Sequence, residues 1–452
     1  MKTENRERER ESIFSFQNLL KAYRSCRKLK RKSLSAANFE LNLENNLFEL
    51  ELELNNRAYS PWPLTCFPIT DPKLREVWAS DFRDRIVHHL VVSWLEPIFE
   101  RKFIFHSYAC RKEKGTHRAV SAVRGAITQK PADFQKNTNL ASLSIRSDEL
   151  YFLQADIQSF FVSVDKEILF SLIKRQVKHP EILWIVQKII FQNPTTNCIV
   201  KGDRTLLSRV PAHKSLFSAP AGKGLPIGNL TSQFFANVYL NELDQFVKHA
   251  LKCRHYFRYM DDFILLSPFK WELQIWRDEI SLFLKNHLKL RLHPKKQIIR
   301  NTGQSINFCG YITKPDYALV RRLTVNKLKV KLRKFNQKML IFCQSKLSNS
   351  KQTRVKADDL IFNNPFIVFE SSEMKTELEK IFNSINSTYG SFRHADCFGL
   401  RKFLFKKHFA YLKLYLGPAD KNFSHFSWNF PKPPRRKRKK TAGAVIGICG
   451  NY

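Results

Sequence analysis

The sequence lacks any pair of cysteines in a C-x-x-C arrangement, although nine cysteines are scattered along its 452 residues. An odd number of dispersed cysteines argues against a disulfide framework and against a zinc site. The sequence also lacks an apolar run near the roughly 18 residues that a membrane-spanning helix needs, and no apolar segment follows the charged N-terminus. These absences predict a cytoplasmic protein with reduced thiols and without a signal peptide or membrane span.

Acidic residues are scarce beside basic ones, because 77 Lys and Arg stand against 40 Asp and Glu and give a formal net charge of +37. The basic C-terminal stretch 432–440 holds only seven of these residues, so the surplus is spread along the whole chain. A surplus of this size indicates a polyanionic partner, most simply nucleic acid, and the alternative is a solubilising surface.

The pattern of apolar residues predicts an α+β protein. Between 151 and 314, strand-like apolar runs alternate with helical segments, which is typical of helices packed around a small sheet. Residues 131–150 are polar and look like an insertion. The predicted regions are an N-terminal helical segment 1–60, a mixed region 61–315, a basic helix within 316–345, a helical region 346–430 and a basic, disordered tail 431–452.

A basic amphipathic helix is predicted over 323–342. Its apolar positions step by threes and fours, and they are Val325, Leu328, Leu332, Phe335, Met339 and Phe342. Lysines fill most of the remaining faces, among them Lys327, Lys331 and Lys334. Such a helix can follow a row of phosphates, or it can be an ordinary helix packed on a core.

Two adjacent acids, Asp261 and Asp262, stand inside the apolar stretch FRYMDDFILL, residues 257–266. A third acid, Asp156, lies in the similar context YFLQADIQSFF, residues 151–161. Buried carboxylates are unfavourable unless they are paired, protonated or bound to metal. If both runs are strands of one sheet, the acids meet and form a site for two Mg²⁺ ions that would assist phosphoryl transfer. A lone acid pair would otherwise indicate a solvated turn.

Several motifs, in chain order, resemble those of bacterial reverse transcriptases. The YMDD sequence at 259–262 resembles the signature of that family, and the resemblance extends over about residues 15–345. The further motifs are DPKLREVWASDFRDRIVHHLV at 71–91, HSYACRKEKGTHRAV at 106–120, ADIQSFF at 155–161, KGLPIGNLTSQFFANVYLNELDQFV at 223–247, LRLHPKKQ at 290–297 and FCGY at 308–311. The resemblance implies a right-hand polymerase fold with fingers, palm and helical thumb, extended by the helical and basic C-terminal region.

The resemblance also implies roles for individual residues. Asp156, Asp261 and Asp262 would be the catalytic metal ligands for two Mg²⁺ ions. The other positions that match substrate-binding positions of the family are Lys73, Arg75 and Arg111 for the triphosphate, Phe161 as a steric gate against rNTPs, Tyr259 and Met260 at the primer end, and Lys296 near the pyrophosphate. Phe161 could also be a plain core residue, and Lys73, Arg75 and Arg111 could be general surface charge. The helix at 323–342 would be part of the thumb, with Lys327, Lys331 and Lys334 on the phosphates of the duplex.

One departure from the general pattern narrows the resemblance. Most reverse transcriptases have glutamine before the glycine in a stretch like LPQG, whereas Ile227 precedes Gly228 here. With Gln233 closing a G-x-x-x-S-Q pattern, the stretch resembles the enzymes of diversity-generating retroelements. Isoleucine cannot donate the side-chain hydrogen bonds of glutamine, so this resemblance predicts error-prone synthesis, especially opposite template adenines. The alternative is that neighbouring residues compensate and fidelity is ordinary.

Three biological roles follow from these interpretations. The first is a diversity-generating retroelement enzyme that copies RNA into mutagenised cDNA. Its substrates would be an RNA template, a DNA or RNA primer and dNTPs. Its partners would be a structured non-coding RNA and a small basic accessory protein that forms an oligomer. The second is an anti-phage defence enzyme that copies a dedicated non-coding RNA or makes DNA without ordinary priming. The third is an inactive nucleic-acid-binding protein. No integrase, endonuclease or RNase H pattern is expected after residue 345.

Overall fold

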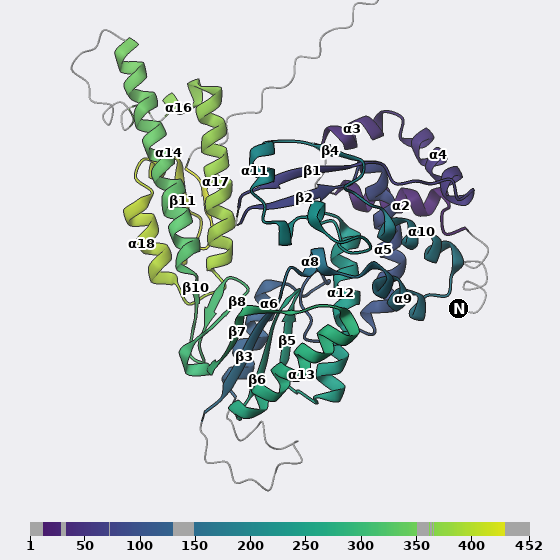
Figure 1. Ribbon diagram of the computed structural model, residues 1–452. Helices are drawn as coiled ribbons and strands as arrows, with labels where there is room; N and C mark the ends of the chain where they lie inside the picture. The colour runs from purple at the N-terminus through teal and green to yellow at the C-terminus, as the bar shows by residue number, and fades with distance from the viewer. Residues whose placement is uncertain are drawn as a thin grey trace, which may run out of the picture. The chain divides into compact units, whose positions relative to one another are not determined.

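The computed structural model describes residues 12–28, 33–71, 73–129, 149–349, 361, 364 and 366–429 (Figure 1). The chain forms two compact units, Met1–Asp316 and Tyr317–Tyr452. Within these ranges, no helix combines the length and the apolar character that crossing a bilayer requires. The architecture is α+β, with many helices and small, mostly antiparallel sheets.

The first unit contains most of the secondary structure. Its α-helices are α2 (Phe16–Arg27), α3 (Leu34–Leu41), α4 (Leu43–Asn55), α5 (Phe82–Glu100), α6 (Thr116–Ile127), α8 (Phe160–Ser163), α9 (Lys166–Gln176), α10 (Pro180–Phe191), α11 (Arg204–Ser208), α12 (Leu230–Gln245) and α13 (Lys270–Leu288). Its strands are β1 (Leu64–Ile69), β2 (Arg75–Ala79), β3 (Tyr151–Ile157), β4 (Cys198–Val200), β5 (Tyr256–Tyr259), β6 (Asp262–Ser267), β7 (Leu292–Asn301), β8 (Ile306–Phe308) and β9 (Tyr311–Thr313). Short 3-10 helices cover η1 (Ala212–Lys214), η2 (Leu216–Ser218) and η4 (Thr302–Gln304), and a π-helix, η3 (Phe246–Ala250), extends α12.

A four-stranded antiparallel sheet in the order β5-β6-β3-β7 organises the centre of this unit. Because successive side chains of a strand point to opposite faces, β3 contributes Leu153 and Ala155 to one core and Phe152 to another. Helices α12 and α13 pack in the first core, and α6 packs in the second (Figure 1). Strands β5 and β6 are therefore buried on both faces, whereas most of β7 is exposed or half-buried.

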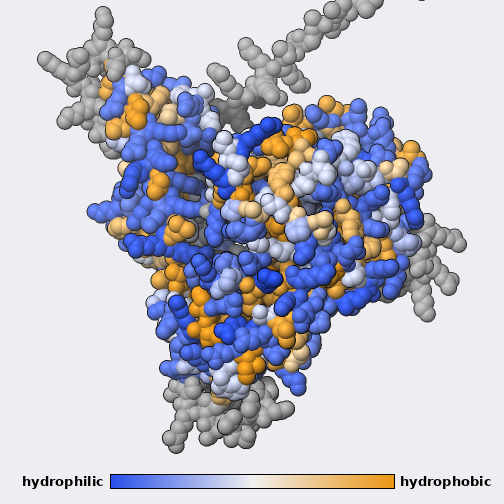
Figure 2. Space-filling model, viewed as in Figure 1, coloured by the Kyte–Doolittle hydropathy of each residue, from blue (hydrophilic) through white to orange (hydrophobic). Residues whose placement is uncertain are grey.

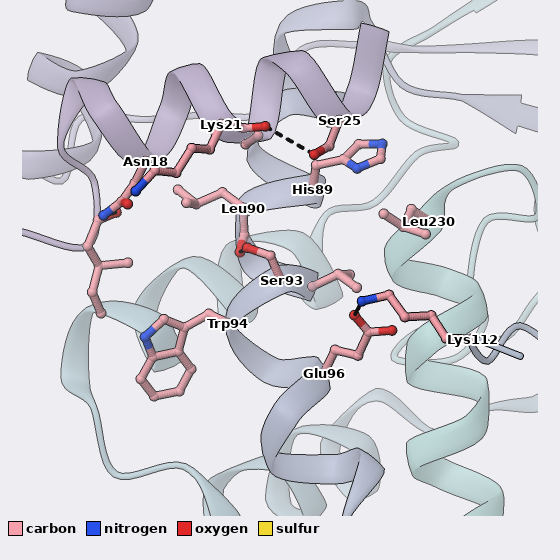
Figure 3. A pocket seen from close by; sticks show the side chains of 13 residues that line it. Asn18, Lys21, Ser25, His89, Leu90, Ser93, Trp94, Glu96, Lys112 and Leu230 are labelled. Atoms are coloured by element: carbon pink, nitrogen blue, oxygen red, sulfur yellow. Dashed lines mark hydrogen bonds and ion pairs between the residues drawn. The ribbon is translucent and has the colours of Figure 1, made fainter. Parts of the chain in front are cut away.

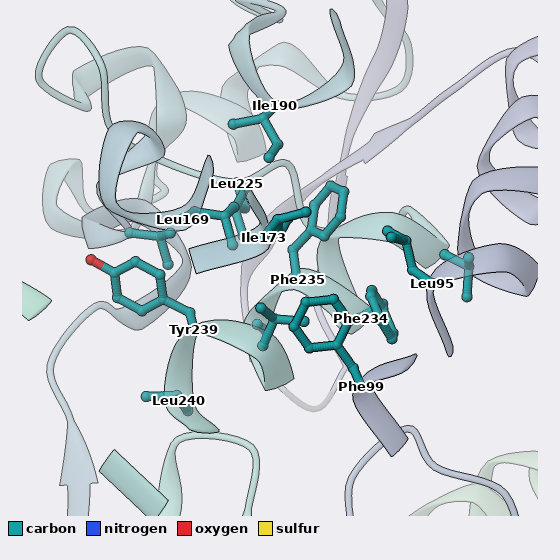
Figure 4. Packing of buried hydrophobic residues seen from close by; sticks show 14 of the residues in the cluster. Leu95, Phe99, Leu169, Ile173, Ile190, Leu225, Phe234, Phe235, Tyr239 and Leu240 are labelled. Atoms are coloured by element: carbon teal, nitrogen blue, oxygen red, sulfur yellow. The ribbon is translucent and has the colours of Figure 1, made fainter. Parts of the chain in front are cut away.

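The larger core depends on α12, which is buried almost all round. Phe234, Phe235 and Tyr239 of this helix extend toward residues of α5 and α9, among them Phe99 and Leu169 (Figure 4). Phe99 and Phe234 meet edge to face, with ring centroids 5.8 Å apart. A helix that is buried around most of its circumference must be central, which makes α12 a support for the strands beside it.

A separate three-stranded sheet in the order β2-β1-β4 is built on the hairpin of β1 and β2. Ile69 pairs with Arg75 next to the loop of this hairpin, and Thr65 pairs with Ala79 at the other end. Its apolar face contains Cys66 and Trp78, which pack in a small cluster with Val162. The hairpin is thereby joined to the segment that follows β3.

The second unit is mainly helical. Its elements are β10 (Ala318–Val320), α14 (Arg322–Asn349), α16 (Ile367–Glu370), α17 (Ser372–Phe392), α18 (Phe398–His408), α19 (Leu412–Tyr415), β11 (Leu416–Pro418) and β12 (Phe426–Trp428). Helix α14 packs against α17 and α18. Strands β11 and β12 form an antiparallel hairpin, and Phe426 packs edge to face on Tyr389 of α17 with ring centroids 4.8 Å apart.

The sequence predictions can be compared with these elements. The structure has helices in the N-terminal segment and after residue 372, as the sequence predicts. Hydrophilic side chains cover most of the surface seen in Figure 2. The predicted apolar face of α14 is buried except at Phe342, where the neighbouring Cys343 is buried instead. Helix α14 also continues to Asn349, past residue 345, where the region of the basic helix was predicted to end. The predicted insertion at 131–150 lies almost entirely outside the described residues, and the predicted tail at 431–452 lies wholly outside them.

Candidate active site

The three acids singled out in the sequence gather at one end of the four-stranded sheet. Asp156 is directly opposite Asp262 in the register of β3 and β6, and Asp262 in turn pairs with Tyr259 of β5. The two residues between Tyr259 and Asp262 form the hairpin turn, and Met260 has a φ of 56° there. The backbone amide of Ile157 donates to the carbonyl oxygen of Asp261 at 3.2 Å. The turn is thus joined to the end of β3.

Electrostatics at this end of the sheet favour a cation. Burial and, second, the nearby negative charge of Asp156 raise the pKa of Asp261 to about 6. The ammonium group of Lys296, on the neighbouring strand β7, forms an ion pair with Asp156. Two neighbouring carboxylates, one of them paired with Lys296, form an oxygen-rich site that could hold a divalent cation.

Asp262 is held differently from the other two acids. The side-chain amide of Gln154, two residues before Asp156 on β3, donates to Asp262 Oδ1 at 3.1 Å and to the backbone oxygen of Asn307 at 2.9 Å. Across the ranges that the structure covers, no three His, Cys, Asp or Glu side chains are grouped closely enough to hold a metal ion. Asp156 thus lies opposite Asp262 in the strand register and close enough to Asp261 to raise its pKa, while Asp262 accepts a hydrogen bond from Gln154.

A buried ion pair supports the turn from the side of α12, and sequence reasoning missed it. Arg258 of β5 and Asp244 of α12 have fully buried side chains, and their closest atoms, Nη2 and Oδ2, are 2.6 Å apart. The same guanidinium donates to the carbonyl of Met260 at 3.1 Å, to Ser107 Oγ at 3.0 Å and to Asn237 Oδ1 at 3.3 Å. One side chain thus connects the turn, α12 and the segment before α6. Its only signal in the sequence is a charged residue inside an apolar strand.

The loop that contains Ile227 joins the hairpin of β1 and β2 to the segment after Asp156. The amide of Leu225 donates to the carbonyl of Phe161 at 2.7 Å, and the amide of Trp78 donates to the carbonyl of Ile227 at 2.7 Å. Gly228 has a φ of +127°, and a Cβ atom there would lie 2.8 Å from the carbonyl oxygen of Trp78. Only glycine fits this close approach without strain. The side chain of Ile227 is half-buried, as is that of Phe161.

Lys73 and Arg75 lie at the tip of the β1–β2 hairpin. Arg75 is the first residue of β2 and is half-buried, whereas Lys73 is exposed in the preceding loop. Neither side chain forms an ion pair with another described residue. No described acid neutralises the charges of Lys73 and Arg75, and the hairpin that bears them contacts the Ile227 loop. Both charges are therefore available for an anionic ligand.

The structure does not support a triphosphate role for Arg111. Its side chain is only 6% exposed and forms an ion pair with Glu100 at 2.5 Å. The guanidinium also donates to the carbonyl oxygens of Ile104 and Ser107, at 2.6 and 2.9 Å, and lies over the ring of Phe103. These contacts use most of the N–H donors of the guanidinium. The guanidinium therefore fixes the turn before α6 and is not free to face an open cleft.

The remaining predicted positions lie on exposed or partly exposed surface. Gln233 is exposed on α12 and accepts a hydrogen bond from the thiol of Cys110 at 3.4 Å. In the second unit, Lys331 and Lys334 are exposed on α14, and Lys327 is half-buried. Lys331 donates to Ser384 Oγ at 3.0 Å. The lysines of α14 thus leave ammonium groups at the surface while the helix packs by its apolar face.

A cavity of about 810 Å³ lies between α2 and α5, apart from the acids (Figure 3). It is lined by polar side chains such as Lys21 and Ser93, and by Trp94. Its basic and acidic groups partly neutralise each other, since Lys112 pairs with Glu96 at 3.5 Å. Nothing in this cavity favours one class of ligand.

Comparisons with known proteins agree with this geometry. The family model "Reverse transcriptase (RNA-dependent DNA polymerase)" matches residues 71–313. Protein YkfC of Escherichia coli (strain K12) is 25% identical over 293 residues, which are 57% of this chain and 68% of YkfC. Group II intron-encoded protein LtrA of Lactococcus lactis subsp. cremoris is 22% identical over 372 residues, which are 67% of this chain and 55% of LtrA. Nuclear intron maturase 1, mitochondrial, of Arabidopsis thaliana is 24% identical over 118 residues, which are 25% of this chain and 14% of that protein.

The matched segment 71–313 begins just before β2 and ends with β9, so it contains the four-stranded sheet, the hairpin turn and the Ile227 loop. It amounts to more than half of the chain. The chain belongs to the reverse transcriptase family, the RNA-dependent DNA polymerases.

Proposed function

We propose that Asp156 and Asp261 are the metal-binding catalytic residues of this RNA-directed DNA polymerase, with Asp262 supporting the turn. The observation that carries this proposal is the register that sets Asp156 against the hairpin turn, where the pKa of Asp261 is raised by burial and by Asp156. In this assignment the four-stranded sheet is the palm, the β1–β2 hairpin belongs to the fingers, and α14 begins the thumb.

The residues at the turn fit Mg²⁺, because their donors are carboxylate oxygens and because two facing negative charges need compensation. Asp156 and Asp261 would hold the ions. Bound Mg²⁺ would supply activation of the primer 3′-hydroxyl and neutralisation of the phosphates. In the reaction, the 3′-oxygen forms a bond to the α-phosphorus of a dNTP, the bond between the α- and β-phosphates breaks, and pyrophosphate leaves.

The chain's own residues would orient the substrates. Lys73 and Arg75 carry uncommitted charges for the triphosphate, and Lys296 is placed by its ion pair with Asp156 to meet the departing phosphates. The half-buried ring of Phe161 packs edge to face on Phe160, with centroids 5.4 Å apart. A ring of this size beside the incoming nucleotide would crowd a ribose 2′-hydroxyl and favour dNTPs over rNTPs.

The template–primer duplex would run along basic surface. The exposed ammonium groups of Lys331 and Lys334, together with that of Lys327, suit contacts to phosphates, which position a duplex without reading its sequence. The net charge of +37 supports a strong electrostatic contribution to such binding.

For the biological role, we propose error-prone cDNA synthesis in a retroelement of the diversity-generating type. The supporting observation is Ile227, whose carbonyl is held by Trp78 while its apolar side chain offers no hydrogen bond to a nascent base pair. An RNA template, a primer, a structured RNA and a small basic accessory protein are the partners this role requires. The competing role is that of a defence enzyme that copies a dedicated RNA. The names of two relatives refer to introns, which is compatible with a retroelement origin.

The test is sequencing of the nucleic acid that copurifies with the wild-type protein and with the double variant Asp261→Ala/Asp262→Ala. cDNA found only with the wild type would support the site, whereas equal cDNA from both proteins would refute it. Mutations clustered at template adenines that disappear in Ile227→Gln would support the diversifying role. Accurate, repetitive or untemplated DNA would favour the defence role.

A further inference from the structure

The segment before α6 carries a cysteine, Cys110, whose backbone is held from two sides. The amide of Tyr108 donates to the carbonyl oxygen of Arg258 in β5 at 2.9 Å. From α12, Asn237 Nδ2 donates to the carbonyl oxygen of Ala109 at 2.8 Å. Cys110 itself has a φ of 53°, in the left-handed region that residues with a Cβ atom seldom adopt and that persists only where the surroundings determine it. Strand β5 and helix α12 therefore set the position of the Cys110 thiol.

The thiol of Cys110 orients a side-chain amide on α12. Cys110 Sγ donates to Gln233 Oε1 at 3.4 Å. Gln233 lies one helical turn before Asn237, so both contacts to the segment come from the same face of α12. The side chain of Gln233 is exposed, and its Nε2 atom forms no hydrogen bond with another described residue. Because the thiol holds the carboxamide oxygen, the two N–H donors of the nitrogen remain available to a ligand.

This pair of side chains lies beside Tyr259, the residue at which β5 enters the hairpin turn. Tyr259 packs against the core cluster that contains Tyr108, two residues before Cys110. Burial and, to a smaller degree, the nearby thiols of Cys309 and Cys110 raise the pKa of Tyr259. The free donors of the Gln233 amide are therefore placed near the turn that carries the proposed catalytic acids.

We propose that Cys110 is a positioning residue, whose thiol aims the amide nitrogen of Gln233 at the minor-groove edge of the last base pair of the template–primer duplex. The inference rests on the proposed function, in which the primer is extended at the turn after Tyr259. Every Watson–Crick pair presents acceptors in the minor groove, and this groove is wide and shallow in an A-form hybrid. A donor at a fixed place there recognises the geometry of a correct pair without reading its sequence.

The contact is separate from the effect of Ile227. Ile227 offers no donor to the nascent pair, whereas Gln233 would act on the pair that is already formed at the primer end. A mismatched terminal pair displaces the minor-groove acceptors, so the hydrogen bond from Gln233 would be made to a matched end and lost at a mismatched one. The arrangement therefore predicts a preference for extending matched primer ends that depends on the thiol of Cys110.

The test is single-nucleotide extension by the full-length protein of two primers that differ only in a matched or mismatched 3′ end. Cys110→Ala should lower kcat/KM for the matched primer about fivefold, the factor of one ordinary hydrogen bond, and should leave kcat/KM for the mismatched primer unchanged. Cys110→Ser should restore the preference, because a hydroxyl can donate to the same oxygen. Gln233→Met removes the amide at similar length and should reproduce the loss, and Cys110→Ala/Gln233→Met should lose no more than either single variant.

Cys397→Ala is the matched control, because the thiol of Cys397 donates to the carbonyl oxygen of Phe392 at 3.0 Å in the second unit. It removes a thiol hydrogen bond of the same kind and should leave the ratio of matched to mismatched extension at its wild-type value. The proposal would be overturned by a wild-type ratio in Cys110→Ala, by an equal loss at both primer ends, or by losses that add in the double variant. If Cys110→Ala does not fold, a wild-type ratio in Gln233→Met overturns the proposal instead.

Failure of this proposal is distinguishable from failure of the proposed function. The proposed function requires that the wild type extends the matched primer and that Asp261→Ala/Asp262→Ala does not. That difference is unaffected by the ratio measured for the variants of Cys110 and Gln233.

Discussion

The ion pair between Arg258 and Asp244 should govern the position of the catalytic turn, and this can be separated from its contribution to stability. Asp244→Asn preserves the shape of the side chain but removes its charge. The guanidinium of Arg258 would then be buried without a counter-ion, while its hydrogen bond to the carbonyl of Met260 remains available. Arg258→Met/Asp244→Asn removes both charges and also removes the contact to the turn.

The two variants should differ in stability. Breaking a buried pair by removing one partner costs about 3–5 kcal/mol, because one charge is left unpaired in a medium of low polarity. Both side chains are 0% exposed, so that full range applies to Asp244→Asn. The double variant leaves no uncompensated charge, and its free energy of unfolding should exceed that of Asp244→Asn by roughly 1–3 kcal/mol.

Catalysis should follow a different order from stability. Without the donor to Met260, the hairpin turn is free to shift, and a displacement of about 1 Å can lower kcat about a hundredfold. We therefore expect kcat to remain low in the double variant although its stability recovers, with little change in the affinity for a template–primer duplex. Urea denaturation and steady-state primer extension, at a temperature where each protein is folded, measure the two quantities.

A buried pair elsewhere provides the matched control. Arg83 and Asp84, near the start of α5, are 3.1 Å apart and have side chains that are 8% and 1% exposed. Arg83→Met/Asp84→Asn should lower stability without a selective loss of kcat in the folded protein. If the double variant at Arg258 and Asp244 regained wild-type kcat along with its stability, the positioning role of Arg258 would be refuted.

Three further predictions concern single residues. Because the pKa of Asp261 in the folded protein, about 6, exceeds the unfolded value of about 3.9, its ionisation should destabilise the magnesium-free protein as pH rises through this range. Thermal melts in EDTA should therefore show that Asp261→Asn has a free energy of unfolding up to about 3 kcal/mol above that of the wild type at pH 7.5, with almost no difference at pH 4. An equal difference at both pH values would contradict the assignment of this pKa. Gly228→Ala should lower the free energy of unfolding by about 1–3 kcal/mol in urea, whereas Gly125→Ala, in α6 with no atom within 4 Å of the added carbon, should raise it slightly. Arg111→Met should lower the free energy of unfolding by about 1–3 kcal/mol, because the carbonyl oxygens of Ile104 and Ser107 lose their donor. A higher KM for dNTP with unchanged stability would instead favour the triphosphate role of Arg111.

Local patterns were sufficient to predict much of this architecture. Apolar spacing identified the face of α14, and the apolar runs around Asp156 and Asp262 predicted strands that could meet. The first prediction succeeds because periodicity reports which face of a helix is buried. The two-residue turn between Tyr259 and Asp262 fixes the register of β5 and β6, and the separate pairing of β3 with β6 brings Asp156 opposite Asp262.

Long-range polar contacts could not be read from the sequence in the same way. Arg111 lies in a motif shared with the family, yet its role is decided by Glu100, eleven residues earlier and on α5. Arg258 finds its counter-ion fourteen residues away on α12. Hydrogen bonding between distant elements has no period, so a charged residue in an apolar strand signals that a partner exists without indicating which residue it is.

The hairpin turn holds the backbone of the proposed metal-binding acids in place. Tyr259 pairs with Asp262 across the hairpin, Ile157 donates to the carbonyl of Asp261, and Arg258 donates to the carbonyl of Met260. Burial and, second, the charge of Asp156 raise the pKa of Asp261 to about 6, although Lys296 already pairs with Asp156. In the proposed assignment, a cation bound by both carboxylates would offset this cost at neutral pH, and the constrained turn would keep the two carboxylates within its reach.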